Sequence, residues 1–123
     1  MNFEDLDVWQ RSVELSADIY KRMQGLKDYG FKDQITRSGL SIPSNISEGF
    51  ERDSDRDCVK FLLYAKGSCG ELRTQVIIGM KVGYIPCEAG EAWKKESLEI
   101  SRMLGGLIRS KRAYIERKSS KKV

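Results

Sequence analysis

Histidine is absent from this 123-residue chain, and with it the side chain that most often serves as a general base or metal ligand. Ser–His and Cys–His nucleophile pairs are therefore impossible. The Glu-x-x-His ligands of a di-iron carboxylate bundle are excluded for the same reason. We expect no catalytic residue, no metal site and no cofactor, and we interpret the chain as a non-enzyme.

Cysteine is scarce, with three residues at Cys58, Cys69 and Cys87. An odd number without C-x-x-C spacing argues against a disulfide framework and against a zinc site. Cys58 and Cys69 lie eleven residues apart on an apolar stripe, so we interpret them as small buried hydrophobic residues. Gly-rich phosphate loops are also missing, which leaves a nucleotide site without support.

Long hydrophobic runs are lacking as well. The longest, around residues 76–80, ends at Lys81, far short of the roughly 18 residues that a membrane span requires. The first five residues, Met1-Asn2-Phe3-Glu4-Asp5, are acidic, where a secretory signal is basic and then apolar. We therefore expect a cytoplasmic protein without membrane contact.

The chain has only two prolines, 33% charged residues and 40% hydrophobic residues, which is the composition of a folded globular domain. Its apolar residues recur with helical period through four segments, roughly 5–24, 28–48, 54–83 and 88–115. The third segment has the strongest pattern, an unbroken 4-3 heptad spacing. Its start is marked by Ser54-Asp55-Arg56-Asp57, which matches a capping box.

Pro43 interrupts the second segment, so the helix there either kinks or breaks into two. The apolar spacing continues in phase across Pro43, which favours a kink. Four heptad-patterned helices with short connections predict an all-α fold, an antiparallel up-down-up-down four-helix bundle. We expect residues 1–115 to form this bundle and residues 116–123 to form a basic, disordered tail.

A polar stripe on the second segment comprises Gln34, Ser38, Ser41, Asn45 and Glu48. It is compatible with a solvated face, a buried hydrogen-bond ladder or a subunit contact. Mid-helix glycines cost about 1 kcal/mol each against alanine, so those of the third segment suggest the close approach of another helix, with simple tolerance as the alternative. Our predicted oligomer interface combines both features: Ser38, Ser41, Asn45, Gly67, Gly70 and Leu98.

Basic residues are distributed unevenly. Residues 109–123 hold seven of the 22 basic residues and one of the 18 acidic ones, so the remaining chain carries 15 basic and 17 acidic side chains. Such a basic run is typical of a polyanion contact, although it also keeps many chains soluble. The basic residues of the second and third segments are compatible with ordinary surface solvation. The candidate nucleic-acid-binding residues are Arg37, Arg52, Arg56, Arg109, Lys111, Arg112, Arg117 and Lys118.

Several short motifs resemble a known family: Asp5-Leu6-x-Val8-Trp9-Gln10, Gln34-Ile35-x-Arg37, Ser41-Ile42-Pro43-x-Asn45-Ile46-x-Glu48-Gly49, Arg52-x-Ser54, Phe61-Leu62-x-x-Ala65-x-Gly67-Ser68 and Glu71-Leu72. They span most of residues 3–110. The chain resembles the bacterial four-helix bundle family that includes proteins encoded by intervening sequences in large-subunit ribosomal RNA genes. That family is similar to the accessory variability determinant protein of diversity-generating retroelements.

The resemblance implies a cyclic oligomer, a barrel-shaped homopentamer, and no catalytic residue. For the retroelement branch it implies binding to nucleic acid or to a reverse transcriptase. The chain departs from the family pattern at Thr36, Ser38, Gly39 and Cys58. The loss of a frequent Arg at Thr36 weakens the expectation of a basic surface around that position.

Two functions therefore remain open, with an enzyme as a distant third. The first is a homo-oligomeric accessory protein that binds nucleic acid, either structured RNA or an RNA–DNA hybrid. The second is a protein-interaction scaffold for a reverse transcriptase or another partner, without direct nucleic-acid contact.

Overall fold

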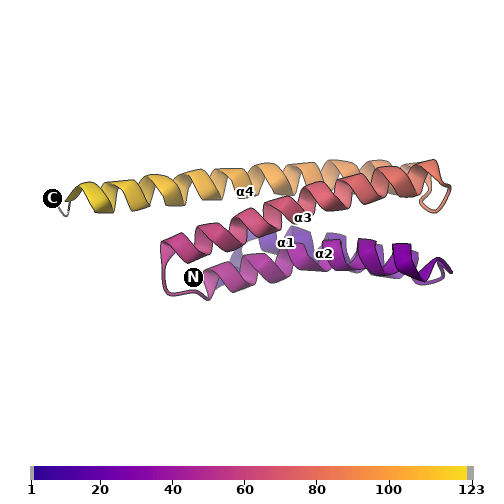
Figure 1. Ribbon diagram of the computed structural model, residues 1–123, viewed down its shortest axis with the longest axis horizontal. Coiled ribbons are helices and arrows are strands. Elements are labelled where there is room, and N and C mark those ends of the chain that lie inside the picture. Colours follow the sequence, from indigo (N-terminus) through magenta and orange to yellow (C-terminus); the bar gives the residue numbers. More distant parts are fainter. Residues whose placement is uncertain (1, 122–123) are drawn as a thin grey trace.

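The computed structural model describes residues 2–121 and consists of helices (Figure 1). A short 3-10 turn, η1 (Phe3–Asp5), precedes four α-helices: α1 (Asp7–Met23), α2 (Tyr29–Phe50), α3 (Asp55–Lys81) and α4 (Cys87–Lys121). No strand occurs among the described residues. The all-helical class and the four helical segments expected from the sequence are confirmed.

Local signals in the sequence set the helix ends. Asp28 caps α2 by accepting a hydrogen bond from the backbone N–H of Phe31 (3.1 Å), and Ser54 caps α3 through the N–H of Asp57 (3.1 Å), as its capping box predicts. Gly83, with φ of 82°, adopts the left-handed conformation that favours glycine and turns the chain out of α3. Helix α2 continues through Pro43 as one element, so the chain does not break there.

The helices lie side by side along the long axis of the molecule. The α1–α2 and α3–α4 connections lie at one end, and the α2–α3 connection lies at the other (Figure 1). Each helix packs against the next one in sequence, and α1 also contacts α4, though less extensively. Their inward faces form one apolar core. The largest of its fully buried side chains are Ile19, Ile35, Ile42, Ile46, Leu62, Leu72, Ile100 and Leu104.

Polar side chains join α1 to α4. Arg11 bridges to Glu96 (2.5 Å) and also to Glu99, and these hydrogen bonds raise the pKa of the guanidinium. Further along, the indole N–H of Trp93 donates to Asp18 (2.7 Å). These contacts hold together the two helices whose packing is sparsest.

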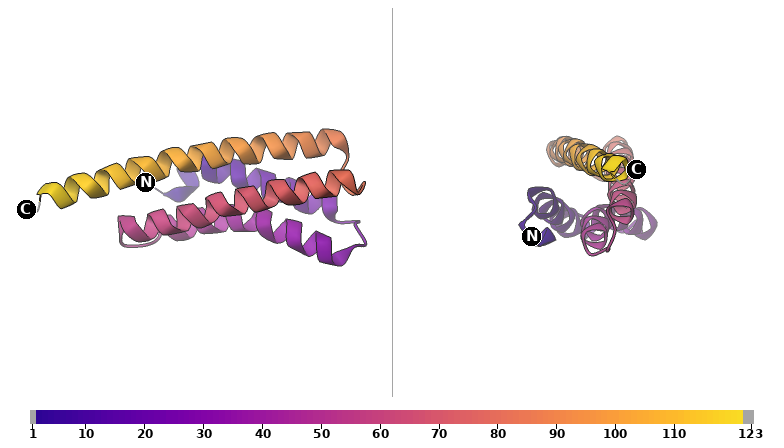
Figure 2. Two further views of the ribbon diagram at one scale, coloured as in Figure 1. Left: turned by 45° about the horizontal axis from the view of Figure 1, so that its top comes forward. Right: turned by 90° about the vertical axis from the view of Figure 1, so that its left-hand side faces the viewer.

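Helix α4 corrects the expected tail. Residues 116–121 are helical rather than disordered, and residues 122–123 lie outside the described part of the chain. Three features stabilise this part of the helix. Ile115 packs against the core, and Lys118 and Lys121 lie in the last turn, where cations offset the helix dipole. Arg and Lys also have a high helix propensity. The C-terminal turns of α4 extend past the α2–α3 connection in both side views (Figures 1 and 2). Within residues 2–121, no helix is long and apolar enough to cross a membrane.

Candidate nucleic-acid interface

The C-terminal part of α4, residues 109–121, carries most of the predicted binding residues, and we call it the basic segment. Arg109, Arg112, Arg117 and Lys118 are exposed on it. Among the described residues, no carboxylate oxygen lies within 4.0 Å of these four cationic groups. Their charge is therefore not neutralised by an ion pair, and it is available to an external anion.

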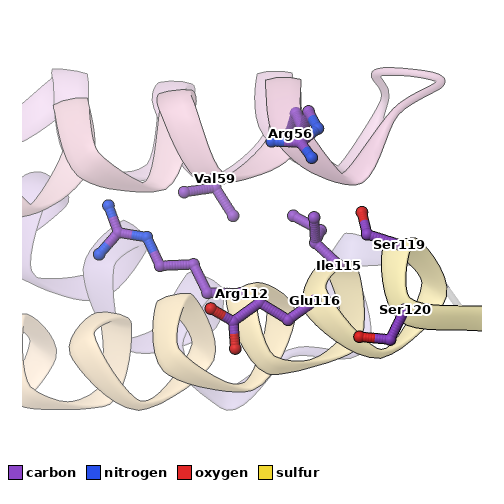
Figure 3. Close-up of a pocket in the computed structure, with 7 residues that line it drawn as sticks. All are labelled: Arg56, Val59, Arg112, Ile115, Glu116, Ser119 and Ser120. Carbon is purple, nitrogen blue, oxygen red and sulfur yellow. The ribbon is translucent and has the colours of Figure 1, made fainter. Parts of the chain in front are cut away.

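The structure brings Arg56 of α3 to the basic segment. An open cleft of about 630 Å³ separates the first turns of α3 from the last turns of α4. Figure 3 shows Arg56 and Val59 on one wall, facing Arg112, Ile115 and Glu116 on the other. Ser119 and Ser120 complete the rim. The cleft thus combines two guanidinium groups, two hydroxyls and one carboxylate.

Lys111 has a different role from its neighbours. Its ammonium lies 3.4 Å from Asp55 Oδ1 and 5.2 Å from the centre of the Phe50 ring, and the side chain is half-buried. These contacts tie α4 to the start of α3. Lys111 thus helps to position the basic segment and, unlike its exposed neighbours, is paired with a carboxylate.

Tyr114 lies among the free cations of the basic segment. Arg117 and Lys118 approach its ring, at 6.0 Å and 5.2 Å from the centre, and the ring itself is exposed. An exposed aromatic ring beside cations is a combination that stacks on nucleic-acid bases.

The structure does not bring Arg37 into this group, and it engages Arg52 elsewhere. Arg37 pairs with Asp33 (3.0 Å) on α2, about 20 Å along the helix from its end at Phe50. Arg52 pairs with Glu48 (2.5 Å), and its guanidinium lies 4.6 Å from the centre of the Phe61 ring. Both are surface ion pairs within one helical turn, so they match the surface interpretation better than the binding one.

The polar stripe on α2 is a hydrogen-bond ladder within the chain. Ser38 is buried and donates to Gln75 (2.5 Å), Ser41 donates to Ser68 (2.6 Å), and Asn45 donates to the Ser41 carbonyl of its own helix (2.8 Å). Ser38 and Ser41 thus face α3 within the chain, and the prediction of Ser38, Ser41 and Asn45 as oligomer contacts stays a prediction. Their small side chains allow α2 and α3 to approach and pair their polar groups.

Gly67 and Gly70 lie instead on the outside of α3. A Cβ atom added at either position would meet nothing within 4 Å, so no helix of the same chain packs there. Exposed apolar side chains flank them on the same face. We call Leu63, Gly67, Gly70, Thr74 and Ile77 the α3 outer face. Leu98 of α4 is also exposed, at 37%. Gly67, Gly70 and Leu98 therefore stay predictions for a subunit contact.

The family model described as 23S rRNA-intervening sequence protein matches residues 4–106. The chain belongs to this family. The resemblance drawn from the sequence motifs is thereby confirmed for the intervening-sequence proteins, and the link to retroelement proteins stays a prediction. The match ends before Arg109, so the basic segment lies outside the family model.

A crystal structure from Bacteroides thetaiotaomicron supports the fold of this family member. It is described as a protein of unknown function from the S23 ribosomal protein family. It is 30% identical, covers 82% of this chain and 97% of its own, and superimposes with a TM-score of 0.77. No curated protein matches the chain.

The most specific family motif in this chain, residues 41–49, is structural. Ile42, Pro43 and Ile46 are buried, and a Cβ at Gly49 would lie 3.1 Å from the carbonyl oxygen of Cys58. The motif therefore packs α2 closely against α3. It identifies the family through its fold and places no functional group at the surface cleft.

The interpretation of Cys58 and Cys69 as small buried hydrophobic residues is confirmed. Cys58 and Cys69 are buried, and burial raises the pKa of both thiols, that of Cys69 to about 12. Cys87 is exposed at the first turn of α4. Within residues 2–121, no group of three or more potential ligand side chains is arranged to hold a metal ion.

Sequence reasoning missed that Arg73 on α3 is partly buried. The Nη1 atom of Arg73 on α3 is buried and has no hydrogen-bond partner among the described residues. Arg73 belongs to the basic residues of the second and third segments, whose pattern is compatible with ordinary surface solvation. The pairing of Lys111 was missed for another reason, because its partner Asp55 is 56 residues away in sequence.

Proposed function

We propose that this chain is a non-enzymatic accessory protein that binds structured RNA in the cytoplasm through the basic segment of α4. The observation that carries the proposal is the group of unpaired cations on a helix that extends past the rest of the molecule. The family description names 23S rRNA, which makes RNA the polyanion that best fits. Sequence-independent binding of this kind depends mainly on phosphate contacts.

The cleft between α3 and α4 suggests how RNA would be held. Arg56 and Arg112 supply planar guanidinium groups that bind phosphate oxygens in a bidentate manner. Glu116, on the same cleft, repels phosphate but accepts a hydrogen bond from a ribose 2′-hydroxyl. The 2′-hydroxyl is the group that distinguishes RNA from DNA.

Self-assembly forms the second part of the proposal. We expect an up-down-up-down bundle that joins through the α3 outer face into a cyclic homo-oligomer, with the homopentamer implied by the family resemblance. Glycines with open space beside them let a neighbouring helix approach closely, and apolar side chains next to them gain from burial. A ring would present several basic segments to one RNA and increase avidity without new contacts.

A charge-matched pair of variants tests RNA binding. The triple variant R112A/R117A/K118A removes three free cations of the basic segment, and the control K81A/K95A/R102A removes three exposed cations elsewhere. Both variants lose the same net charge. We expect the first to lower affinity for a structured 23S rRNA fragment at least tenfold, and the control to change it by less than threefold, because each lost phosphate contact costs affinity. Equal losses in both would contradict the proposal.

One observation favours the scaffold alternative, namely the exposed apolar row of the α3 outer face. Such a surface also fits a protein partner, for instance a polymerase. A protein that stays bound to the tagged chain after nuclease treatment, and is released by a charged substitution at Ile77, would support the scaffold. If nuclease treatment releases that partner completely, the partner is held through RNA and the scaffold alternative is rejected.

A further inference from the structure

A second groove lies between α1 and α2, near the connection that joins them. Its volume is about 630 Å³, and its lining is mainly apolar and includes Tyr20, Tyr29 and Thr36. Tyr29 is 70% exposed and Tyr20 is 44% exposed. The groove is at the end of the molecule opposite the C-terminal end of α4 (Figure 1). It therefore shares no residue with the α3–α4 cleft.

Two lysines flank the tyrosines. Lys32 reaches the carbonyl oxygen of Gln24 (3.2 Å), and its ammonium lies 5.1 Å from the centre of the Tyr29 ring. Lys21 lines the same groove. Among the described residues, neither ammonium has a carboxylate oxygen within 4.0 Å.

The acidic residues around the groove are already engaged. Asp33 pairs with Arg37 (3.0 Å). Asp18 accepts from Trp93 (2.7 Å) and pairs with Arg22 (3.5 Å). Asp28 accepts hydrogen bonds from the N–H of Phe31 and from the Tyr84 hydroxyl. The two lysines thus leave a local excess of positive charge beside exposed aromatic rings.

The geometry points to a binding site for an unpaired nucleotide of RNA in this groove, with its base stacked on Tyr29 or Tyr20 and its phosphate held by Lys21 and Lys32. A tyrosine face stacks on any base, and adjacent cations attract the backbone, which together bind single strands with little sequence preference. Thr36 adds no base-reading group, because its hydroxyl donates to the carbonyls of Lys32 and Asp33. The inference rests on the proposed function, since it supplies a second RNA contact at the other end of the molecule.

Binding of a single-stranded oligoadenylate that carries one 2-aminopurine tests the inference on the full chain. We expect Y29A and Y20A to weaken binding by between about 5-fold and 150-fold, the range that loss of one stacked base implies. Y29F keeps the ring and should bind like the unmodified chain. Quenching of the 2-aminopurine should persist with Y29F and disappear in at least one of the two alanine variants. The double variant K21Q/K32Q should reduce the salt dependence of binding while keeping the quenching.

Each other outcome rejects the nucleotide site. Unchanged affinity and quenching in both alanine variants would show that the tyrosines do not stack on bases. A smaller solution mass in Y29A would show that a second copy of the chain covers the groove instead. This result can be told apart from failure of the proposed function. If R112A/R117A/K118A loses binding to structured RNA while Y29A binds normally, the proposed function is supported and only the groove is rejected. Binding indifferent to both sets of variants rejects both.

Discussion

Two glycines show how much the surroundings of single residues differ within this fold. A Cβ at Gly79 on α3 would lie 2.5 Å from Ile85 Cδ1 and 2.9 Å from Phe31 Cζ. A Cβ at Gly25, after α1, would meet nothing within 4 Å. Gly79 is thus needed for close packing of the α3–α4 turn against α2, whereas Gly25 is not.

We therefore expect G79A to lower the free energy of unfolding by about 1–3 kcal/mol, because Ile85 and Phe31 must move out of well-packed positions. Denaturant unfolding at a fixed protein concentration measures the loss. G25A serves as the control and should leave the unfolding midpoint nearly unchanged. Equal stability of the two variants would mean that Ile85 and Phe31 can move to accommodate the added methyl group without lowering the free energy of unfolding.

Sequence reasoning was most successful for residues on a strong periodic pattern. Cys58 and Cys69 were assigned to the core because the heptad spacing of α3 continues through them, and both are buried. It left alternatives open where one pattern has several physical causes. Ser38 and Ser41 repeat with the same period whether they face water, another subunit or α3, and only the positions of Gln75 and Ser68 decide between these.

At the scale of whole helices, the ends of α3 were predictable and the end of α4 was not. Ser54 and Gly83 are local signals that need no knowledge of the tertiary structure. The basic segment has no such signal, and its scarcity of apolar residues suggested disorder. Contacts with residues far away in sequence help to make it helical. Ile115 packs against the core, and Lys111 contacts Asp55 and Phe50.

The cap of α2 predicts how stability depends on pH. Hydrogen bonds from the Phe31 N–H and the Tyr84 hydroxyl lower the pKa of Asp28 below its ordinary value of 3.8. A carboxylate with a lowered pKa in the folded state contributes stability above its unfolded pKa, and that contribution is lost as the pH falls through the folded pKa. The melting temperature should therefore decrease below about pH 4.

The variant D28N isolates this contribution. Asparagine still caps a helix but does not titrate, so D28N should melt at a slightly lower temperature than the unmodified chain at pH 7 and show a smaller decrease between pH 5 and pH 2.5. Glu99, whose pKa is lowered by its hydrogen bond from Arg11, contributes in the same direction and remains in both proteins. Identical pH profiles for the two proteins would show that the Asp28 cap is not formed in solution.

At the scale of the whole molecule, the family fold and the basic segment are separate features. The family model covers residues 4–106, and the buried motif at residues 41–49 explains why it identifies the fold. The free cations begin at Arg109. We infer that the bundle provides a scaffold and a surface for assembly, while the extension of α4 supplies the contact with RNA.

Assembly through the α3 outer face predicts a specific sensitivity. Solution mass measured by light scattering should be near five times 14.1 kDa for the unmodified chain. G67L/G70L places two large side chains where a neighbouring helix would approach, so it should reduce the mass to that of a smaller species while the helical content is retained. Two leucines at exposed positions of α2, Q34L/S44L, are the control and should leave the mass unchanged. A monomeric mass for the unmodified chain would contradict cyclic assembly.

The most direct test of RNA binding by the basic segment is the slope of log affinity against log salt concentration for a structured 23S rRNA fragment. Each phosphate contact contributes about 0.7 to 0.9 to this slope. If Arg112, Arg117 and Lys118 each contact a phosphate, R112A/R117A/K118A should reduce the slope of the unmodified chain by about 2 to 3, and K81A/K95A/R102A should leave it unchanged. A slope that is the same in all three proteins would contradict the placement of the RNA contact on α4.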